Sequence, residues 1–307
     1  MRVLVIGSVA GGTSAAAKMR RNSEDLEIVI YDMDKDISYS GCGIPYFVGE
    51  DYISREDLTP RNSQWFKKRF NIDIFTEHKV TDIDFEKKLI SVINLKTGEA
   101  FTDSYDKLVI AVGANPSIPN IEGIDSANVF PVRNVQSGER IKIFIKEKNP
   151  KSAVIIGAGF IGLEMAENLK SRGLDVTLIE SAPHVMPSMD YEMALYIQDH
   201  LLKNGVKLYT SEKVESITEN GRYVNTLSGS KIATDMIVVA TGVKPATDIV
   251  KNKGIELGLH GGIIVNDKME TNIPDVYAVG DCCEVKSTVT GEYIYRPLGS
   301  TAIRWGA

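Results

Sequence analysis

The chain has 307 residues, 43% of them hydrophobic and 25% charged, a balance that suits a soluble globular protein of about two domains. Its 35 Lys and Arg against 41 Asp and Glu give a net charge of −6, which argues against a nucleic-acid partner, since that role needs a basic surface. The three cysteines, Cys42, Cys282 and Cys283, are too few for a disulfide framework, and neither they nor the four histidines have metal-ligand spacing, so we predict a reducing, cytoplasmic compartment and no metal site.

The N-terminal segment 3–21 is an apolar run followed by glycines and an alanine-rich stretch. It is too short for a membrane span, and its single leading charge, Arg2, weakens the alternative of a signal peptide cleaved after Ala15–Ala17. We predict a buried strand, a glycine turn, a helix and a second strand ending at Asp32, which is the βαβ unit of a parallel sheet. The glycines of the turn are Gly7, Gly11 and Gly12.

Cys42 follows in the segment ISYSGCGIPYFVG, residues 37–49, with a glycine on each side that leaves its sulfur open to close approach. Pro45 suits the first turn of a helix, and a helix N-terminus favours the thiolate form of a nearby cysteine. The alternative is a buried, inert thiol, because free cysteines are commonly buried. No second cysteine lies within five residues, so a redox-active Cys42 would cycle through a mixed disulfide, a persulfide or a sulfenic acid.

The strand–turn–helix–strand pattern returns at 153–173, and its second strand ends at Glu180. The GxGxxG glycines of this copy are all present: Gly157, Gly159 and Gly162. Free N–H groups at the helix start suit a pyrophosphate, and the acid accepts hydrogen bonds from ribose hydroxyls. The first copy departs from the pattern, with Val9 in place of the middle glycine. Glu180 would repel a 2′-phosphate and no Arg follows it closely, so we expect NADH, with NADPH as the alternative.

Motifs along the whole chain resemble those of the single-cysteine branch of the flavin-dependent pyridine nucleotide–disulfide oxidoreductases. They are GSVAGG (7–12), SGCGIPY (40–46), AVGANP (111–116), GAGFIGLE (157–164) with ATGVKP (240–245), and YAVGDCCEV (277–285), which leads into PLGSTA (297–302). The branch includes coenzyme A-disulfide reductases, NAD(P)H-dependent persulfide or polysulfide reductases, NADH oxidases and NADH peroxidases. The resemblance implies an α/β fold similar to that of glutathione reductase, in which two Rossmann-like FAD- and NAD(P)-binding domains have parallel central sheets and added antiparallel strands.

The resemblance also implies the cofactor sites, with FAD at the first glycine turn and NADH or NADPH at the second. The cofactor-binding residues it implies are Gly7, Ala10, Gly11, Gly12, Asp32, Met33, Ser40, Val80, Ala111, Gly113, Gly157, Gly159, Phe160, Ile161, Gly162, Glu164, Glu180, Gly242, Gly280, Asp281, Leu298, Gly299 and Ser300. Among these, 298–300 would lie by the flavin ring. Glu164 would meet the nicotinamide carboxamide, or is simply a carboxylate placed favourably near a helix N-terminus.

Cys42 is the catalytic residue that the resemblance implies: it would receive electrons from NADH through FAD and reduce a low-molecular-weight disulfide or persulfide such as coenzyme A disulfide. Ala10 stands where NADH oxidases and peroxidases carry a His, which favours a sulfur substrate over oxygen or peroxide. Arg20 and Arg21 would contact coenzyme A phosphates, with Ser38 as a further substrate residue, although basic residues favour helix C-termini in any case. The alternatives are an NADH oxidase or peroxidase, an electron-transfer reductase for a small iron protein, and a truncated cofactor-binding module with little turnover.

Repeat and resemblance together predict a discontinuous FAD-binding domain at 1–114 and 247–307 and an NAD(P)H-binding domain at 115–246, with prolines near both crossings. Relatives continue into a C-terminal dimerisation domain that this sequence does not include. We therefore expect a shortened form that binds a small-molecule substrate but neither nucleic acid nor membrane. The homodimer usual in the family is not assumed.

Overall fold

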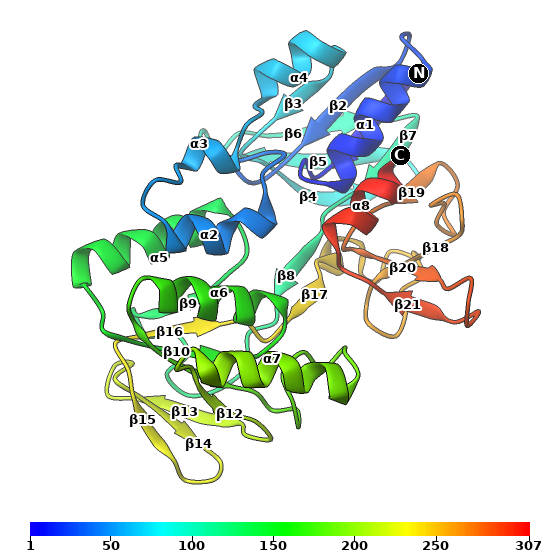
Figure 1. Cartoon of the computed structure of the whole chain (residues 1–307). Coiled ribbons are helices and arrows are strands. Elements are labelled where there is room, and N and C mark those ends of the chain that lie inside the picture. Colours follow the sequence, from blue (N-terminus) through cyan, green and yellow to red (C-terminus); the bar gives the residue numbers. More distant parts are fainter. The chain divides into compact units, whose positions relative to one another are not determined.

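The computed structural model describes all 307 residues, and the chain divides into two compact units (Figure 1). Unit 1 comprises Met1–Tyr39, Thr59–Asn115 and Val243–Ala307, and unit 2 comprises Ser40–Leu58 and Pro116–Gly242. The sequence pattern places Ser40–Leu58 in the FAD-binding range, whereas the structure packs this segment with unit 2. Which cofactor each unit binds stays a prediction.

Unit 1 is built on a five-stranded parallel sheet with strand order β19-β7-β1-β2-β3. These strands are β1 (Arg2–Ile6), β2 (Glu27–Tyr31), β3 (Asp73–Phe75), β7 (Lys107–Ile110) and β19 (Val276–Ala278). Alternate side chains of β1 enter separate core clusters, Leu4 and Ile6 on one face and Val3 and Val5 on the other. From Val3 to Ile6 the strand is apolar because both faces of the sheet are covered.

The remaining elements of unit 1 surround this sheet. Its helices are α1 (Gly11–Asn22), α4 (Ser63–Phe70) and α8 (Gly299–Gly306), with a short 3-10 helix at Thr247–Val250. The added strands are β4 (His78–Asp84), β5 (Leu89–Asn94), β6 (Ala100–Ser104), β8 (Ala114–Pro116), β17 (Val243–Pro245), β18 (Ile263–Val265), β20 (Cys283–Lys286) and β21 (Tyr293–Tyr295). β4, β5 and β6 form an antiparallel sheet, β18, β20 and β21 form a second small sheet, and β8 pairs with β17.

Unit 2 repeats the arrangement with a parallel sheet in the order β12-β11-β10-β16-β9. These strands are β9 (Val129–Pro131), β10 (Ser152–Ile156), β11 (Asp175–Ile179), β12 (Lys207–Tyr209) and β16 (Met236–Val239). The longer helices are α5 (Val135–Lys148), α6 (Phe160–Ser171) and α7 (Tyr191–Lys203), and β13 (Val214–Thr218), β14 (Tyr223–Thr226) and β15 (Lys231–Ala233) form an antiparallel sheet. The Cys42 segment adds a 3-10 turn at Gly41–Gly43, α2 (Ile44–Gly49) and α3 (Arg55–Leu58). The predicted fold, two parallel sheets with added antiparallel strands, is confirmed.

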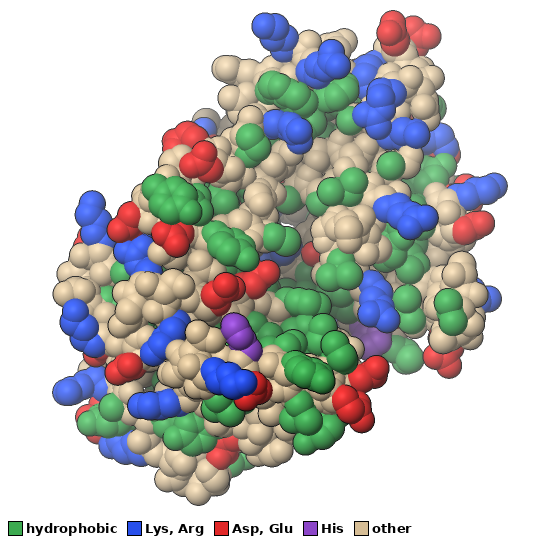
Figure 2. Space-filling model, viewed as in Figure 1, with side chains coloured by type: hydrophobic (Ala, Val, Ile, Leu, Met, Phe, Trp, Pro, Cys, Tyr) green, Lys and Arg blue, Asp and Glu red, His purple; other side chains and the backbone are tan.

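Helix α7 is the element of unit 2 with the most exposed apolar side chains. Only Ala194 and Leu201 of this helix are buried. Hydrophobic side chains gather over it on the face seen in Figure 2, and those exposed are Tyr191, Met193, Leu195, Tyr196 and Leu202. This helix therefore contributes few side chains to the core of unit 2.

Candidate functional site: two glycine turns and an exposed cysteine

The two glycine turns share one backbone geometry. Gly7 after β1 has φ +103°, and Gly157 after β10 has φ +102°. A Cβ on Gly7 would lie 2.2 Å from the Ala111 carbonyl oxygen, and one on Gly157 would lie 2.4 Å from that of Ala240. Both conformation and space therefore require glycine, and in each unit the turn lies against the loop that follows the neighbouring strand.

The last glycine of each motif sets the start of the helix directly on the turn. A Cβ on Gly12 would lie 1.9 Å from the Gly7 carbonyl oxygen, and one on Gly162 would lie 2.0 Å from that of Gly157. This close approach directs the first N–H groups of α1 and α6 at the space beyond the strand ends, where a pyrophosphate binds in such folds.

The middle position of the motif behaves differently. A Cβ on Gly159 would meet no protein atom within 4 Å, so packing does not require glycine there. In dinucleotide-binding turns, glycine at this position lets the ligand approach the backbone closely, so a ligand role for Gly159 stays a prediction. Because the first copy carries Val9, half-buried, at this position, Val9 is compatible with the fold.

The acid that ends each second strand is buried and held by the glycine turn. In unit 1, Asp32 Oδ2 accepts hydrogen bonds from the Ser8 backbone N–H (2.7 Å) and Ser8 Oγ (2.6 Å), and Oδ1 accepts one from the Asp34 N–H (2.8 Å). Burial raises the pKa of the Asp32 carboxyl despite these donors. In a carboxylate with about four acceptor positions, three are filled, which leaves one for a ribose hydroxyl.

Glu180 repeats the arrangement in unit 2. Its Oε2 accepts from the Ala158 N–H (2.7 Å), and its Oε1 accepts from the Ala182 N–H (2.8 Å) and Ser181 Oγ (3.2 Å). Both acids therefore join the turn to the loop after the second strand. The donor pattern in both units fits the adenosine ribose of a dinucleotide.

A third motif meets the first glycine turn at the carboxyl edge of the unit 1 sheet. Gly280, with φ +83°, follows β19, and a Cβ on Gly11 would lie 3.4 Å from its nitrogen. Helix α8 packs on α1 so closely that a Cβ on Gly306 would lie 2.6 Å from the Gly11 carbonyl oxygen, and the two helices lie side by side in Figure 1. Predicted cofactor residues at this edge or at the start of α8 are Gly7, Ala10, Gly11, Gly12, Asp32, Ala111, Gly280, Asp281, Leu298, Gly299 and Ser300.

Other predicted residues lie in varied surroundings. Val80 is a residue of β4 with its side chain buried in the core, whereas the Met33 side chain is exposed. Gly113 lies beyond β7 and its carbonyl accepts from the Ala246 N–H. Ser38 N–H donates to the Ser8 carbonyl (2.9 Å), which places it beside the first turn, while Ser40 belongs to unit 2.

In unit 2, the predicted residues at the start of α6 differ in exposure. Phe160 is exposed and Ile161 is half-buried. Burial, with a smaller contribution from the charge of Glu167, raises the pKa of the Glu164 carboxyl. Gly242 has φ +93° and an open Cβ direction, in the loop that follows β16.

Arg20 has a structural role that its sequence position did not suggest. Its Nε donates to the Phe70 carbonyl (2.8 Å), its Nη2 donates to the carbonyls of Leu26 (2.6 Å) and Asn71 (3.1 Å), and its Nη1 bonds the carbonyl of Glu24. These bonds join the ends of α1 and α4. Arg21 is exposed, so of the two arginines it is the one with its guanidinium open to a substrate phosphate.

Cys42 is the only exposed cysteine of the chain and lies in the 3-10 turn before α2. The predicted helix after it is confirmed, with Pro45 in its first turn. A Cβ on Gly41 would meet no atom within 4 Å, whereas one on Gly43 would lie 2.6 Å from Leu58 Cδ2. One side of the turn is therefore packed and the other is open, and the alternative of a buried thiol is wrong, while the redox role of Cys42 stays a prediction.

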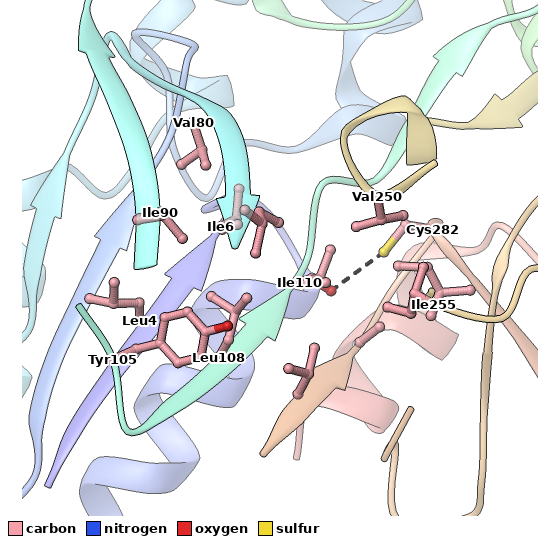
Figure 3. Close-up of a cluster of buried hydrophobic side chains, with 14 of the residues drawn as sticks. Leu4, Ile6, Val80, Ile90, Tyr105, Leu108, Ile110, Val250, Ile255 and Cys282 are labelled. Carbon is pink, nitrogen blue, oxygen red and sulfur yellow. Dashed lines mark hydrogen bonds between the residues drawn. The ribbon is translucent and has the colours of Figure 1, made fainter. Parts of the chain in front are cut away.

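Cys282 and Cys283 are free and fully buried in the unit 1 core. Cys282 Sγ donates to the Ile110 carbonyl at 3.5 Å, drawn as a dashed line in Figure 3, and lies 3.8 Å from Cys283 Sγ. Burial raises the pKa of the Cys283 thiol. Neither thiol is accessible to a substrate.

Two residues that support the glycine turns could not be identified from the sequence pattern. Ser8 supplies both donors to Asp32 Oδ2, and only its place directly after the first glycine hints at this. Met186, with φ +48°, donates its N–H to the Ala158 carbonyl (2.8 Å) and so folds the loop after Glu180 back onto the second turn. A methionine in left-handed backbone leaves no recognisable signal in a sequence.

Two nucleotide-type turns, each on its own parallel sheet, and an exposed cysteine are the features expected of the pyridine nucleotide–disulfide oxidoreductase class. The family model described as pyridine nucleotide-disulphide oxidoreductase matches residues 1–294, and the chain belongs to this family. It is 42% identical over 311 aligned residues to a protein of Methanocaldococcus jannaschii named NADH oxidase, covering all of this chain and 68% of that one. It is 36% identical to the coenzyme A disulfide reductase of Staphylococcus haemolyticus, covering all of this chain and 67% of that one.

Solved structures agree with these sequence matches. The reduced CoADR-RHD of Bacillus anthracis superposes with a TM-score of 0.97 at 43% identity, over 99% of this chain and 55% of that one. An NAD-dependent persulfide reductase from A. fulgidus superposes with a TM-score of 0.95 at 38% identity, over all of this chain and 58% of that one. The chain thus spans between about half and two thirds of the length of these relatives. None of its helices combines the length and the apolar character needed to cross a bilayer.

Proposed function

We propose that this chain binds FAD in unit 1 and NADH in unit 2, and that it passes electrons to Cys42, which reduces a low-molecular-weight disulfide or persulfide of the coenzyme A type. The exposed turn of Cys42 carries the proposal, because it offers one accessible sulfur in a protein whose other two thiols are buried. Printed names among the relatives, coenzyme A disulfide reductase and NAD-dependent persulfide reductase, support a sulfur substrate.

The residues divide the work as follows. Gly7, Gly12, Asp32 and Gly280 would hold FAD, which when bound supplies a two-electron relay between nicotinamide and sulfur. The second turn and Glu180 would bind NADH by its pyrophosphate and ribose. Glu180 excludes a 2′-phosphate by charge, so we expect NADH over NADPH.

The sulfur chemistry belongs to Cys42. Its thiolate attacks one sulfur of the substrate RSSR, the S–S bond breaks, one RS⁻ leaves, and a mixed disulfide Cys42–SR forms. Two electrons and a proton then release the second thiol and regenerate the thiolate. The net reaction, NADH + H⁺ + RSSR → NAD⁺ + 2 RSH, balances in atoms and electrons.

Oxygen is the alternative acceptor, and the name of the Methanocaldococcus relative favours it. Ala10 argues against it, because a methyl group cannot donate a hydrogen bond or a proton to an oxidised cysteine. Parallel assays with oxygen and with coenzyme A disulfide separate the two acceptors.

The decisive experiment compares the wild type with Cys42→Ser, both reconstituted with FAD and oxidised with coenzyme A disulfide before anaerobic titration with NADH. We expect the wild type to consume two NADH per flavin and the variant one, because only the wild type holds a mixed disulfide. Disulfide turnover should fall by at least about a hundredfold, since the nucleophile is lost.

Cys283→Ala is the matched control, because it removes a buried thiol and should leave turnover unchanged. Full disulfide turnover by Cys42→Ser would refute the proposal and favour an electron-transfer reductase. Rapid oxygen consumption without disulfide turnover in the wild type would instead establish an NADH oxidase.

A further inference from the structure

The Cys42 segment, Ser40–Leu58, is held by other parts of unit 2 at the C-terminal end of α2, whereas Cys42 precedes the N-terminal end of that helix. Helix α2 has only six residues, and its last carbonyls have no partners within the helix. Two cations from elsewhere in unit 2 hold this end of the segment: Arg172, at the C-terminus of α6, bonds two of those carbonyls, and Lys142, in the middle of α5, bonds the chain just beyond them. We call this pair the α2 clamp.

Lys142 bonds the chain just beyond α2. Its Nζ donates to the carbonyls of Glu50 and Ile53, both at 2.8 Å, and lies 4.2 Å from the ring centre of Phe47. Burial lowers the pKa of the ammonium group. Both bonded carbonyls and the ring belong to the Cys42 segment. The Lys142 side chain therefore holds both the last residues of α2 and the chain that follows them.

Arg172 bonds the last turn itself. Its Nη1 donates to the carbonyls of Val48 (3.2 Å) and Gly49 (3.3 Å) and to Asp51 Oδ1 (2.9 Å). Arg172 is also the C-cap of α6, the helix that begins at the second glycine turn. One helix thus carries the proposed NADH-binding turn at its start and a support of the Cys42 segment at its end.

Close backbone packing makes this support rigid. A Cβ on Gly49 would lie 2.2 Å from Asn168 Oδ1 on α6, and a Cβ on Gly138 of α5 would lie 3.0 Å from Ile44 Cγ2. Helix α2 therefore packs directly on α5 at its N-terminal end and on α6 at its C-terminal end. A six-residue helix without such support would fray, because its few internal hydrogen bonds do not repay the cost of ordering it.

We propose that Lys142 and Arg172 are positioning residues for the redox chemistry of Cys42, holding its turn in place through the C-terminal end of α2. The inference rests on the proposed role of Cys42 in disulfide reduction. It predicts that loosening the clamp slows the reaction at sulfur while sparing the reaction with NADH, since misplacing a reacting group by about 1 Å costs up to about a hundredfold in rate.

The test uses the FAD-loaded full chain with Lys142→Met and Arg172→Met, which keep an unbranched apolar stem but remove the charged head group and its hydrogen bonds. Hydrogen exchange of the amides within 43–49, where Pro45 has none, should become at least about tenfold faster. Reoxidation of the reduced enzyme by coenzyme A disulfide should slow by at least about tenfold, with flavin reduction by NADH unchanged within about twofold.

Lys148→Met, an exposed lysine two turns further along α5, is the matched control and should change none of these rates. Arg172→Lys, which restores a cation, should recover part of the reoxidation rate. Unchanged exchange in 43–49, or faster exchange with unchanged reoxidation, would overturn the proposal. Hydrogen exchange is measured without turnover, so it tests the clamp independently of the proposed function. A failure of the proposed function would instead be seen as full disulfide turnover by Cys42→Ser.

Discussion

The two buried acids, Asp32 in unit 1 and Glu180 in unit 2, allow the same chemical change to be made in each unit. Asp32→Asn and Glu180→Gln each keep the shape of the side chain and replace one oxygen by an NH₂ group. Because each acid accepts at both of its oxygens, the new NH₂ must face a backbone N–H in either orientation, at Ser8 or Asp34 in unit 1 and at Ala158 or Ala182 in unit 2.

The magnitude follows from those contacts. Leaving one buried N–H without an acceptor costs about 1–3 kcal/mol of folding stability. The ribose hydroxyl also loses a charged acceptor, which contributes about 1.5–3 kcal/mol to binding, so the nucleotide should bind about tenfold to a hundredfold more weakly. Removing the carboxylate charge should also improve NADPH relative to NADH in Glu180→Gln.

The assay measures both nucleotides in both variants. We expect Glu180→Gln to raise the KM for NADH and keep its flavin, and Asp32→Asn to lose FAD on gel filtration while NADH still binds, as followed by fluorescence. Each variant serves as the control for the other, because the change in chemistry is the same.

An unchanged KM for NADH in Glu180→Gln, together with a lowered melting temperature, would refute the reasoning, because the acid would then only support its own turn. Loss of FAD from Glu180→Gln but not from Asp32→Asn would show that the two cofactors had been assigned to the wrong units.

Two further predictions concern folding. Gly162→Ala should lower the free energy of unfolding by about 1–3 kcal/mol, because its Cβ would lie 2.0 Å from the Gly157 carbonyl oxygen. Gly159→Ala, with open space around its Cβ, should change the free energy of unfolding by less than about 0.5 kcal/mol. Equal losses of stability in urea unfolding would contradict this prediction. The ammonium groups of Lys107 and Lys88 lower the pKa of Asp275 from 3.8 to about 2, so its contribution to stability is present above pH 4 and is lost as the pH falls through about 2. Asp275→Asn should therefore be less stable than the wild type at pH 6, with a difference in urea midpoint that shrinks between pH 4 and pH 2; a constant difference would exclude the ion pairs as its cause.

Much of the nucleotide-binding framework could be predicted from sequence, because its determinants are close together in the chain. Gly7 and Gly12 are five residues apart, as are Gly157 and Gly162, and each pair makes its contact within one strand–turn–helix unit. The helix after Cys42 was likewise predictable from Pro45. In these places local backbone geometry and residue type decide the structure together.

Contacts between distant segments left no such trace. Arg20 lies where a basic residue suits a helix end, but its guanidinium bonds Phe70 and Asn71, about 50 residues away. The sequence around Val80 has the alternation of any strand, and only the packing of the folded sheet shows that this side chain faces the core.

The residue types and spacings of the sequence by themselves determined the two βαβ units, their glycine turns, their terminal acids and the glycine-flanked cysteine, because each depends on neighbours along the chain. Tertiary structure alone decided that Cys42 belongs to unit 2 and that Lys142 and Arg172 support its helix. Those bonds join residues 89 to 124 positions apart, where the folded backbone, and no sequence period, brings donor and acceptor together.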